Sequence, residues 1–239
     1  GLGDVYKRQV LLSVGKDNVY IWEKGEKKLH ENEAAEILRE MCQGEYMHPT
    51  PVKEGKIELV ADIDGLLKVN SDKIKKVNSM GEMMIASRHG NFAVKKGDKL
   101  AGTRIIPLVI EKEKMESAKA VCEGQTILSL KPFVHKKVGI VTTGNEVYYH
   151  RIEDTFTPVI KEKLADYDTE VIGQVVCNDD HEKITKAILS LIEKGADLVL
   201  CTGGMSVDPD DKTPLAIKNT GAKIVSYGAP VLPGAMFLL

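Results

Sequence analysis

The chain has 239 residues, enough for one large or two modest domains, and its 43% hydrophobic and 28% charged residues are ordinary for a globular protein. Its formal net charge of -2 argues against a general nucleic-acid-binding protein, which normally carries a basic patch. No apolar run reaches the roughly 18 residues of a membrane span, and the four cysteines form no C-x-x-C pair of a zinc or redox site. We therefore expect no membrane contact and a reduced, cytoplasmic setting.

The two ends of the chain differ from ordinary termini. Residues 1–9 lack an initiator Met and any clear periodicity, so we expect a non-native leader there. The chain stops inside the apolar run 235–239, which predicts a domain truncated at its C-terminus. Between these ends we expect a mixed α+β region over residues 10–135 and an α/β domain over residues 136–239.

The first region combines short apolar runs with helical patterns. Ala34, Ile37, Leu38 and Met41 share one face of a helix expected over 33–42. The other expected elements are strands at 10–14 and 19–22, a hairpin of strands 56–61 and 66–69, a helix capped by Ser71 and running to Val77, strands at 92–94 and 104–110, a helix over 114–123 and a strand over 126–130. Ser87–His89 and Thr103-Arg104 offer anion contacts, although a strand arginine is more often a solvated edge or an interface ion pair.

From Lys137 onward the pattern changes to strands alternating with helices. Residues 138–141 form a continuous apolar run, which is typical of a strand buried on both faces. Further strands are expected at 170–176, 196–201 and 223–227. Three helices are expected: one that begins at a cap formed by Asp154 or Thr155, one over 180–193, and one that begins at Thr213-Pro214. This alternation predicts a three-layer α/β fold with a mostly parallel sheet.

Unusual loops follow each expected strand of this half. In an open parallel sheet, ligands bind beyond the carboxyl ends of the strands, so the loops share one rim. Gly144, Gly203 and Gly204 would let backbone N–H groups approach an anion closely. Hydroxyl donors would be added by Thr142, Thr143, Thr202 and Ser206. One glycine pair alone is explained better by a tight strand-to-loop turn than by an anion-binding site.

Acidic residues gather on the same rim: Glu146, Asp179, Asp180, Asp208, Asp210 and Asp211. Such carboxylates repel an anionic ligand unless a cation lies between them, and Mg²⁺ binds through one or two carboxylates together with substrate phosphates. A solvated turn is a credible alternative for Asp208 and Asp210. His181, beside Asp180, is expected to be an exposed first-turn residue.

The segment from Lys137 to Gly234 resembles the molybdopterin-binding domain shared by molybdopterin adenylyltransferases, molybdopterin molybdenumtransferases and gephyrin. Four ordered motifs carry the resemblance: Val138–Val147, Asn178–Asp180, Thr202–Asp211 and Pro233-Gly234. The stretch Arg104–Leu108 is similar to a domain of the molybdenumtransferase subgroup.

The resemblance implies a ligand that is molybdopterin, its adenylylated form or the molybdenum cofactor, with molybdate and AMP or ATP as co-substrates. By position, Glu146, Asp179 and Asp211 match the family's functional acidic residues, of which Asp179 and Asp211 would bind Mg²⁺. The pterin phosphate would be held by Thr143, Gly144, Gly203, Gly204, Ser206, Pro233 and Gly234. The resemblance also implies a homo-oligomer and a molybdenum enzyme as client.

Two positions depart from the family pattern. Phe156 stands where a polar ligand contact is common, and Ala235 stands where the transferases often continue with lysine. Two hypotheses therefore remain: an enzyme of molybdenumtransferase type, or a catalytically silent carrier or sensor of the cofactor. A nicotinamide-dependent enzyme and a P-loop NTPase are disfavoured, because neither G-x-G-x-x-G nor G-x-x-x-x-G-K-[S/T] occurs.

Overall fold

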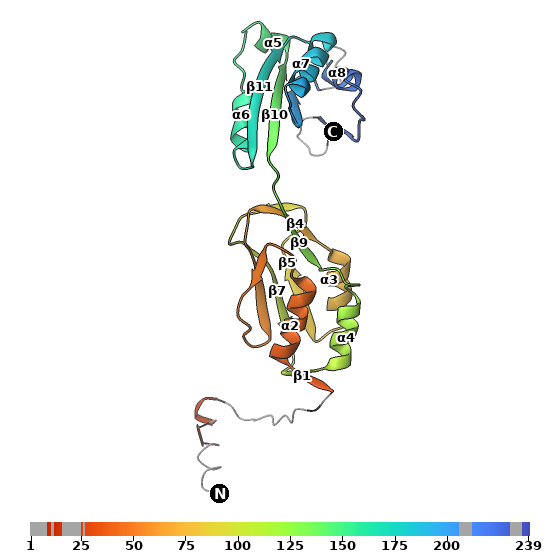
Figure 1. The fold of residues 1–239 in the computed structure, drawn as a ribbon. Coiled ribbons are helices and arrows are strands. Elements are labelled where there is room, and N and C mark those ends of the chain that lie inside the picture. The colour runs from red at the N-terminus through yellow and green to blue at the C-terminus, as the bar shows by residue number, and fades with distance from the viewer. Residues whose placement is uncertain (1–8, 11, 16–24, 26, 206–211, 230–235) are drawn as a thin grey trace. The chain divides into compact units, whose positions relative to one another are not determined.

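The computed structural model describes residues 9–10, 12–15, 25, 27–205, 212–229 and 236–239. The chain forms two compact units, Gly1–Pro132 and Phe133–Leu239, called here the N-terminal and C-terminal units (Figure 1). Each unit is considered by itself. None of the described helices has the length and apolar composition needed to cross a membrane.

The N-terminal unit is built from antiparallel sheets and three helices. Its strands are β1 (Lys28–His30), β2 (Met47–Pro49), β3 (Lys56–Ala61), β4 (Gly65–Val69), β5 (Met83–Ser87), β6 (Phe92–Val94), β7 (Lys99–Ile105), β8 (Val109–Glu111) and β9 (Leu128–Pro132), and its helices are α2 (Glu31–Cys42), α3 (Ser71–Asn78) and α4 (Lys112–Ala120). The main sheet has the order β2-β3-β7-β5, a second has the order β6-β4-β9, and β1 pairs with β8. Residues of all three helices and both larger sheets share one core.

Several expectations for this unit are wrong in detail. The strand expected at 10–14 is helical at its described residues, where the amide of Val14 donates to the carbonyl of Val10; the strand at 19–22 lies outside the described residues. β3 and β4 belong to different sheets and form no hairpin. Asn70, not Ser71, caps α3, since its side chain accepts a hydrogen bond from the amide of Lys73. Pro107 interrupts the long strand expected at 104–110, which becomes β7 and β8.

The C-terminal unit is a parallel sheet with helices on both faces. Its sheet has the order β11-β10-β12, formed by β10 (Lys136–Thr143), β11 (Thr169–Cys177) and β12 (Leu198–Thr202), and all of its pairs are parallel. The helices are α5 (Asn145–Tyr148), α6 (Phe156–Leu164), α7 (His181–Glu193) and α8 (Thr213–Asn219). In Figure 1, α6 and α7 lie on opposite sides of the sheet. This arrangement confirms the predicted α/β fold.

The alternation of side chains along β10 explains the two covered faces. Val141 joins the core with Ile184, Ile188 and Leu191 of α7, while Thr142, one residue on, faces α6 through a contact with Thr157. α7 lies very close to the sheet: a Cβ on Gly139 would come within 2.9 Å of Leu191, and one on its neighbour Gly173 within 2.6 Å. The two glycines therefore allow the helix to pack directly on the backbone.

The fourth parallel strand expected at 223–227 is not formed. Instead, β13 (Tyr227–Gly228) pairs antiparallel with β14 (Phe237–Leu238) in a separate two-stranded sheet. The helical pattern of the sequence also predicts that Val159 of α6 and Ile192 of α7 face inward. This prediction is wrong, since both residues are about half exposed (48% each). β13 is thus not a strand of the parallel sheet.

Candidate functional site at the carboxyl edge of the parallel sheet

The three parallel strands of the C-terminal unit end at the same edge of the sheet. β10 is followed by Gly144, β11 by Asn178 and β12 by Gly203. Of the predicted site residues, Thr143, Gly144, Glu146, Asp179, Gly203 and Gly204 are described. The others, Ser206, Asp211, Pro233 and Gly234, lie outside the described residues, as do Asp208 and Asp210.

Gly203 and Gly204 are pressed against the end of β10. Both have positive φ angles, +87° and +55°, which glycine adopts without strain. A Cβ on Gly203 would lie 2.1 Å from the carbonyl oxygen of Thr143, and one on Gly204 would lie 2.8 Å from Oγ1 of Thr213. Both glycines are therefore required by the close approach of this loop to its neighbours, whether or not a ligand is present.

The buried hydroxyl of Thr143 joins the glycine loop to the start of α8. Its Oγ1 donates to the carbonyl oxygen of Thr202 at 3.2 Å and lies 3.0 Å from Oγ1 of Thr213. Thr143 and Thr213 are almost fully buried (2% and 0% exposed). The Thr143 hydroxyl thus fixes the protein's own loops, so the predicted direct contact with a ligand would compete with bonds already made.

Asn145 and Asp179 form a reciprocal bridge between the loops after β10 and β11. The amide of Asn145 donates to Oδ2 of Asp179 at 3.0 Å, and the amide of Asp179 donates to Oδ1 of Asn145 at 3.4 Å. This bridge sets the direction of the Thr142–Glu146 loop. Oδ1 of the Asp179 carboxylate accepts no hydrogen bond from the described residues.

The neighbouring carboxylate has a different role. Asp180 caps α7 by accepting from the amides of Glu182 and Lys183, and these backbone hydrogen bonds, that of Lys183 above all, hold its pKa below the usual range. The cap occupies the positive end of the longest helix at this edge, and α5 and α8 have only 4 and 7 residues. The helix ends at this edge therefore offer little positive partial charge beyond that already used by Asp180.

A third carboxylate, Asp154, organises the α6 face of the same edge. It accepts hydrogen bonds from the amides of Phe156 and Thr157, and its Oδ2 also lies 3.4 Å from Oγ1 of Thr142 and from Nε2 of Gln174. Burial raises the pKa of Asp154, but the hydrogen bonds from Thr157, Phe156 and Thr142 outweigh it and leave the pKa below its usual value. Of the two expected caps, Asp154 supplies the hydrogen bonds to the first amides of α6, whereas Thr155, the N-cap residue by position, makes no side-chain capping bond.

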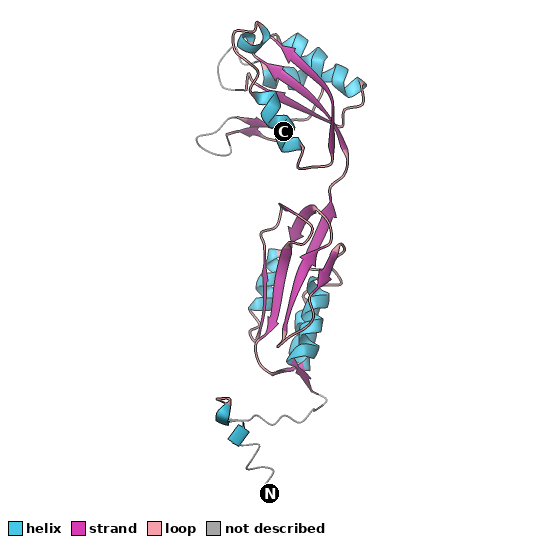
Figure 2. Cartoon of the chain, turned by 90° about the vertical axis from the view of Figure 1, so that its left-hand side faces the viewer, coloured by secondary structure: helices cyan, strands magenta, loops and turns pink. Residues whose placement is uncertain are grey.

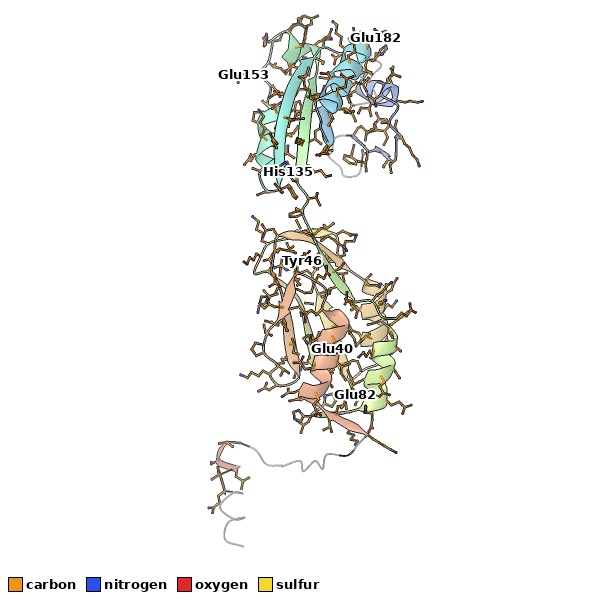
Figure 3. All side chains as sticks on the ribbon, in the orientation of Figure 1. Glu40, Tyr46, Glu82, His135, Glu153 and Glu182 are labelled. Atoms are coloured by element: carbon orange, nitrogen blue, oxygen red, sulfur yellow. The ribbon has the colours of Figure 1, made fainter. Side chains whose placement is uncertain are left out.

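Asp154 also lies at one side of a polar hollow of about 520 Å³, with Val147, Gln174 and Val176. The loop His150–Glu153 completes its lining. Figure 3 places Glu153 beside α6 and Glu182 on α7, on opposite sides of the sheet. The hollow is therefore separate from the glycine loop, which packs against the start of α8.

Three polar atoms at this edge are buried without a hydrogen-bond partner among the described residues: Oδ1 of Asn178, Nδ1 of His181 and Oγ1 of Thr202. Each follows or ends a parallel strand or begins α7. A buried polar atom without a partner costs free energy, so such atoms are rare in folded proteins. A ligand that formed hydrogen bonds with these three atoms would remove this free-energy cost.

Of these three residues, the sequence offers Thr202 as a hydroxyl donor but misses Asn178 and His181 as individual candidates. Asn178 and Thr202 were visible as polar residues at strand ends, but nothing in the pattern indicated that their side-chain atoms lie unpaired. His181 is half-buried, so the expectation of an exposed residue is wrong. Glu146, by contrast, is exposed on α5. In the part of the chain that the structure describes, no three His, Cys, Asp or Glu side chains gather in a way that would hold a metal ion.

The comparisons with known proteins concern this unit. Residues 139–237 match the model of a family described as "Probable molybdopterin binding domain". A CinA-like protein of Mycobacterium avium is 32% identical over 80 residues, which make up 34% of this chain and 18% of that protein. The chain therefore spans about a fifth of the length of the curated relatives that it matches.

Solved structures with a similar fold have TM-scores of 0.35 to 0.36. The molybdopterin biosynthesis enzyme MoaB of Thermus thermophilus shares 28% sequence identity, over 39% of this chain and 58% of its own, with a TM-score of 0.35. The tungsten cofactor synthesizing protein MoaB of Pyrococcus furiosus shares 29%, over 38% of this chain and 57% of its own, with a TM-score of 0.36.

Proposed function

We propose, from the premise that residues 139–237 form a domain of the molybdopterin-binding family, that this chain binds molybdopterin and acts in molybdenum cofactor biosynthesis as a molybdenumtransferase-type enzyme. The observation that carries the proposal is the set of unpartnered buried atoms on Asn178, His181 and Thr202, at the sheet edge where α/β folds bind ligands. A pterin offers both donors and acceptors to such a set.

The phosphate of the pterin would lie on the glycine loop. Gly203 and Gly204 turn the backbone at the end of β12 with positive φ angles, which supports an approach by backbone N–H groups that a side chain would block. Gly144 does the same after β10, with a φ of +135°. Ser206, Pro233 and Gly234 would complete this cradle, as the resemblance implies.

Mg²⁺ would neutralise the charge between the ligand's phosphates and the protein. Asp179 fits this role because one of its carboxylate oxygens is engaged by Asn145 and the other accepts nothing from the described residues. Asp211 would be the second carboxylate, and Glu146 would orient the phosphate bond. When bound, the ion would supply charge neutralisation, on which phosphoryl chemistry largely depends, and the protein groups would position the reacting phosphate.

A catalytically silent carrier or sensor of the cofactor is the second candidate. It is favoured by Phe156, whose ring is 50% exposed where a polar contact to the ligand is common in the family. Under this alternative the same edge would bind the cofactor without changing it. The resemblance also leads us to propose a homo-oligomer in the cytoplasm and a molybdenum enzyme that receives the cofactor.

The experiment that separates the two candidates is an assay of AMP release from adenylylated molybdopterin. We expect release that requires both molybdate and Mg²⁺ and that is lost in Asp211→Ala. Tight binding of the pterin without release of AMP would contradict the enzyme hypothesis and support the carrier hypothesis. Absence of binding would reject both.

A further inference from the structure

The main sheet of the N-terminal unit has one covered face and one open face. Buried side chains of β3, β5 and β7 face α2 and α3, while the alternate residues point the other way. Figure 2 shows the strands of this unit toward the viewer, with its helices beside and behind them. The open face is defined by Lys56 and Glu58 of β3, Gly102 and Arg104 of β7, and Met84 and Ala86 of β5.

Two cations lie side by side on this open face. Lys56 and Arg104 are direct register partners across β3 and β7, and both are exposed. Like charges directly opposite one another destabilise a sheet, and no ion pair relieves either of them within the described part of the chain. Glu58, two residues along β3 from Lys56, is held instead by Nζ of Lys99 at 2.8 Å. The pair is therefore an unneutralised positive centre.

The next row of the open face consists of Glu58, Gly102 and Ala86, and its positions on β7 and β5 carry little or no side chain. Gly102 lies in β7, between β3 and β5, and its register partner on β5 is Ala86. A Cβ added to Gly102 would meet nothing within 4 Å, so neither packing nor a positive φ requires glycine there. Glycine weakens a strand interior and often marks a place where another backbone approaches closely. Gly102 and Ala86 line a hollow of about 280 Å³.

The two cations that line this hollow, Arg88 and Lys99, already form ion pairs within the chain. Arg88 donates to the carbonyl oxygen of Lys99 at 2.7 Å and pairs with Asp98, and Lys99 pairs with Glu58. Of these four cations, Lys56 and Arg104 are thus the two that make no ion pair with the described residues. A footprint this short fits one or two carboxylates, whereas a nucleic acid would require a longer basic track and a less acidic chain.

We propose that this open face docks an acidic segment of a partner protein. Carboxylates of the segment would pair with Lys56 and with the guanidinium of Arg104, which suits bidentate binding. Its backbone would pass over Gly102 and Ala86, and the side chain of Met84, which is 44% exposed and is the register partner of Arg104, would contact an apolar residue. All residues of this surface belong to the N-terminal unit.

The test uses the full chain and a fluorescein-labelled decapeptide in which Glu alternates with Leu. Fluorescence anisotropy should report binding that weakens between roughly 50 mM and 500 mM salt, because the contact is electrostatic. The double variant Lys56→Glu/Arg104→Glu should bind about tenfold more weakly or worse. Lys76→Glu, which reverses an exposed cation on α3, should bind like the unchanged chain.

A second pair of variants tests the role of Gly102. Gly102→Leu should weaken peptide binding by filling the hollow, whereas Gly102→Ala should keep the fold and bind nearly as well, since its Cβ enters open space. Circular dichroism and thermal melting check that each variant is folded. The proposal is overturned if the unchanged chain does not bind the peptide, or if Lys56→Glu/Arg104→Glu binds equally well. Equally tight binding of a single-stranded oligonucleotide would also overturn it.

Discussion

The amide of Asn145 and the carboxylate of Asp179 join two loops that are 34 residues apart in the sequence, and the amide of Asp179 returns a bond to the side chain of Asn145. The bridge spans the carboxyl ends of β10 and β11, which are parallel neighbours. Asp179 therefore has a structural role through one oxygen and a proposed Mg²⁺-binding role through its charge. The two roles are separable by substitution.

Asp179→Asn should keep the acceptor for the Asn145 amide but lose the charge that Mg²⁺ needs. We expect pterin binding without Mg²⁺ to be retained and the Mg²⁺-dependent gain in affinity to disappear. Asp179→Ala should lose both, with pterin binding weakened about tenfold by the loss of about 1 to 1.5 kcal/mol of loop positioning. Calorimetric titrations with and without Mg²⁺ measure both effects. If Asp179→Asn and Asp179→Ala gave the same titration results, separate structural and Mg²⁺-binding roles of Asp179 would be contradicted.

Gly203→Ala should destabilise the C-terminal unit strongly. The added Cβ would combine a φ of +87° with a 2.1 Å contact to the Thr143 carbonyl, and we expect a loss of about 3 kcal/mol or more in the free energy of unfolding. Gly221→Ala is a matched control, since its φ is +86° but its Cβ would meet nothing within 4 Å. It should lose only about 1 kcal/mol. Urea unfolding followed by circular dichroism compares the two; similar losses would contradict the contact.

Asp154 should make the stability of the C-terminal unit depend on acid pH. Its pKa is lowered in the folded state, so its contribution is fully present above the ordinary aspartate pKa of about 4 and is lost as the pH falls through the folded-state value. At pH 7, Asp154→Asn should be less stable by about 1 kcal/mol through the weaker cap of α6. Melting curves between about pH 7 and pH 2.5 should show this difference shrinking toward acid. A constant difference would show that the charge is not involved.

Cys42 and Cys201 should make stability fall at alkaline pH. Burial, followed by the neighbouring thiols of Cys122 and Cys177 respectively, raises the pKa of each from 9.0 to about 12. A raised folded-state pKa gives stability that is present below the ordinary value and lost as the pH rises toward about 12. The double variant Cys42→Ala/Cys201→Ala should therefore lose less melting temperature above about pH 9 than the unchanged chain does. An identical pH dependence would contradict the burial of these thiols.

Much of the C-terminal unit was predictable because its elements carry strong local signals. α7 was placed within one residue by the spacing of Ile184, Ile188 and Leu191 and by Gly195 after its end. β10 was visible as a continuous apolar run, and its doubly buried position is confirmed. The resemblance of this unit to molybdopterin-binding domains was also recognisable from the ordered loop motifs, and residues 139–237 match the model of that domain family.

The failures come from pairings that a single sequence does not encode locally. Residues 56–61 and 66–69 are strands as expected, but tertiary packing assigns them to separate sheets. Residues 223–227 looked like a parallel strand, yet Val225 and Ser226 hydrogen-bond to Leu239, and Tyr227 pairs antiparallel with Leu238. The orphaned atoms of Asn178, His181 and Thr202 were invisible for the same reason, because an unmade hydrogen bond depends on every neighbour in three dimensions.

The central claim is that the carboxyl edge of the parallel sheet binds molybdopterin through groups left unpaired in the fold. Thr202→Val removes the orphaned Oγ1, so it should leave the unfolding free energy unchanged or slightly raised, whereas Thr143→Val breaks existing bonds and should lower it.

The most direct measurement is therefore a calorimetric titration of the unchanged chain and of Thr202→Val with molybdopterin. The account predicts binding by the unchanged chain and about fivefold to tenfold weaker binding by a variant that is at least as stable. No binding by the unchanged chain, or equal affinity of the two proteins, would contradict it.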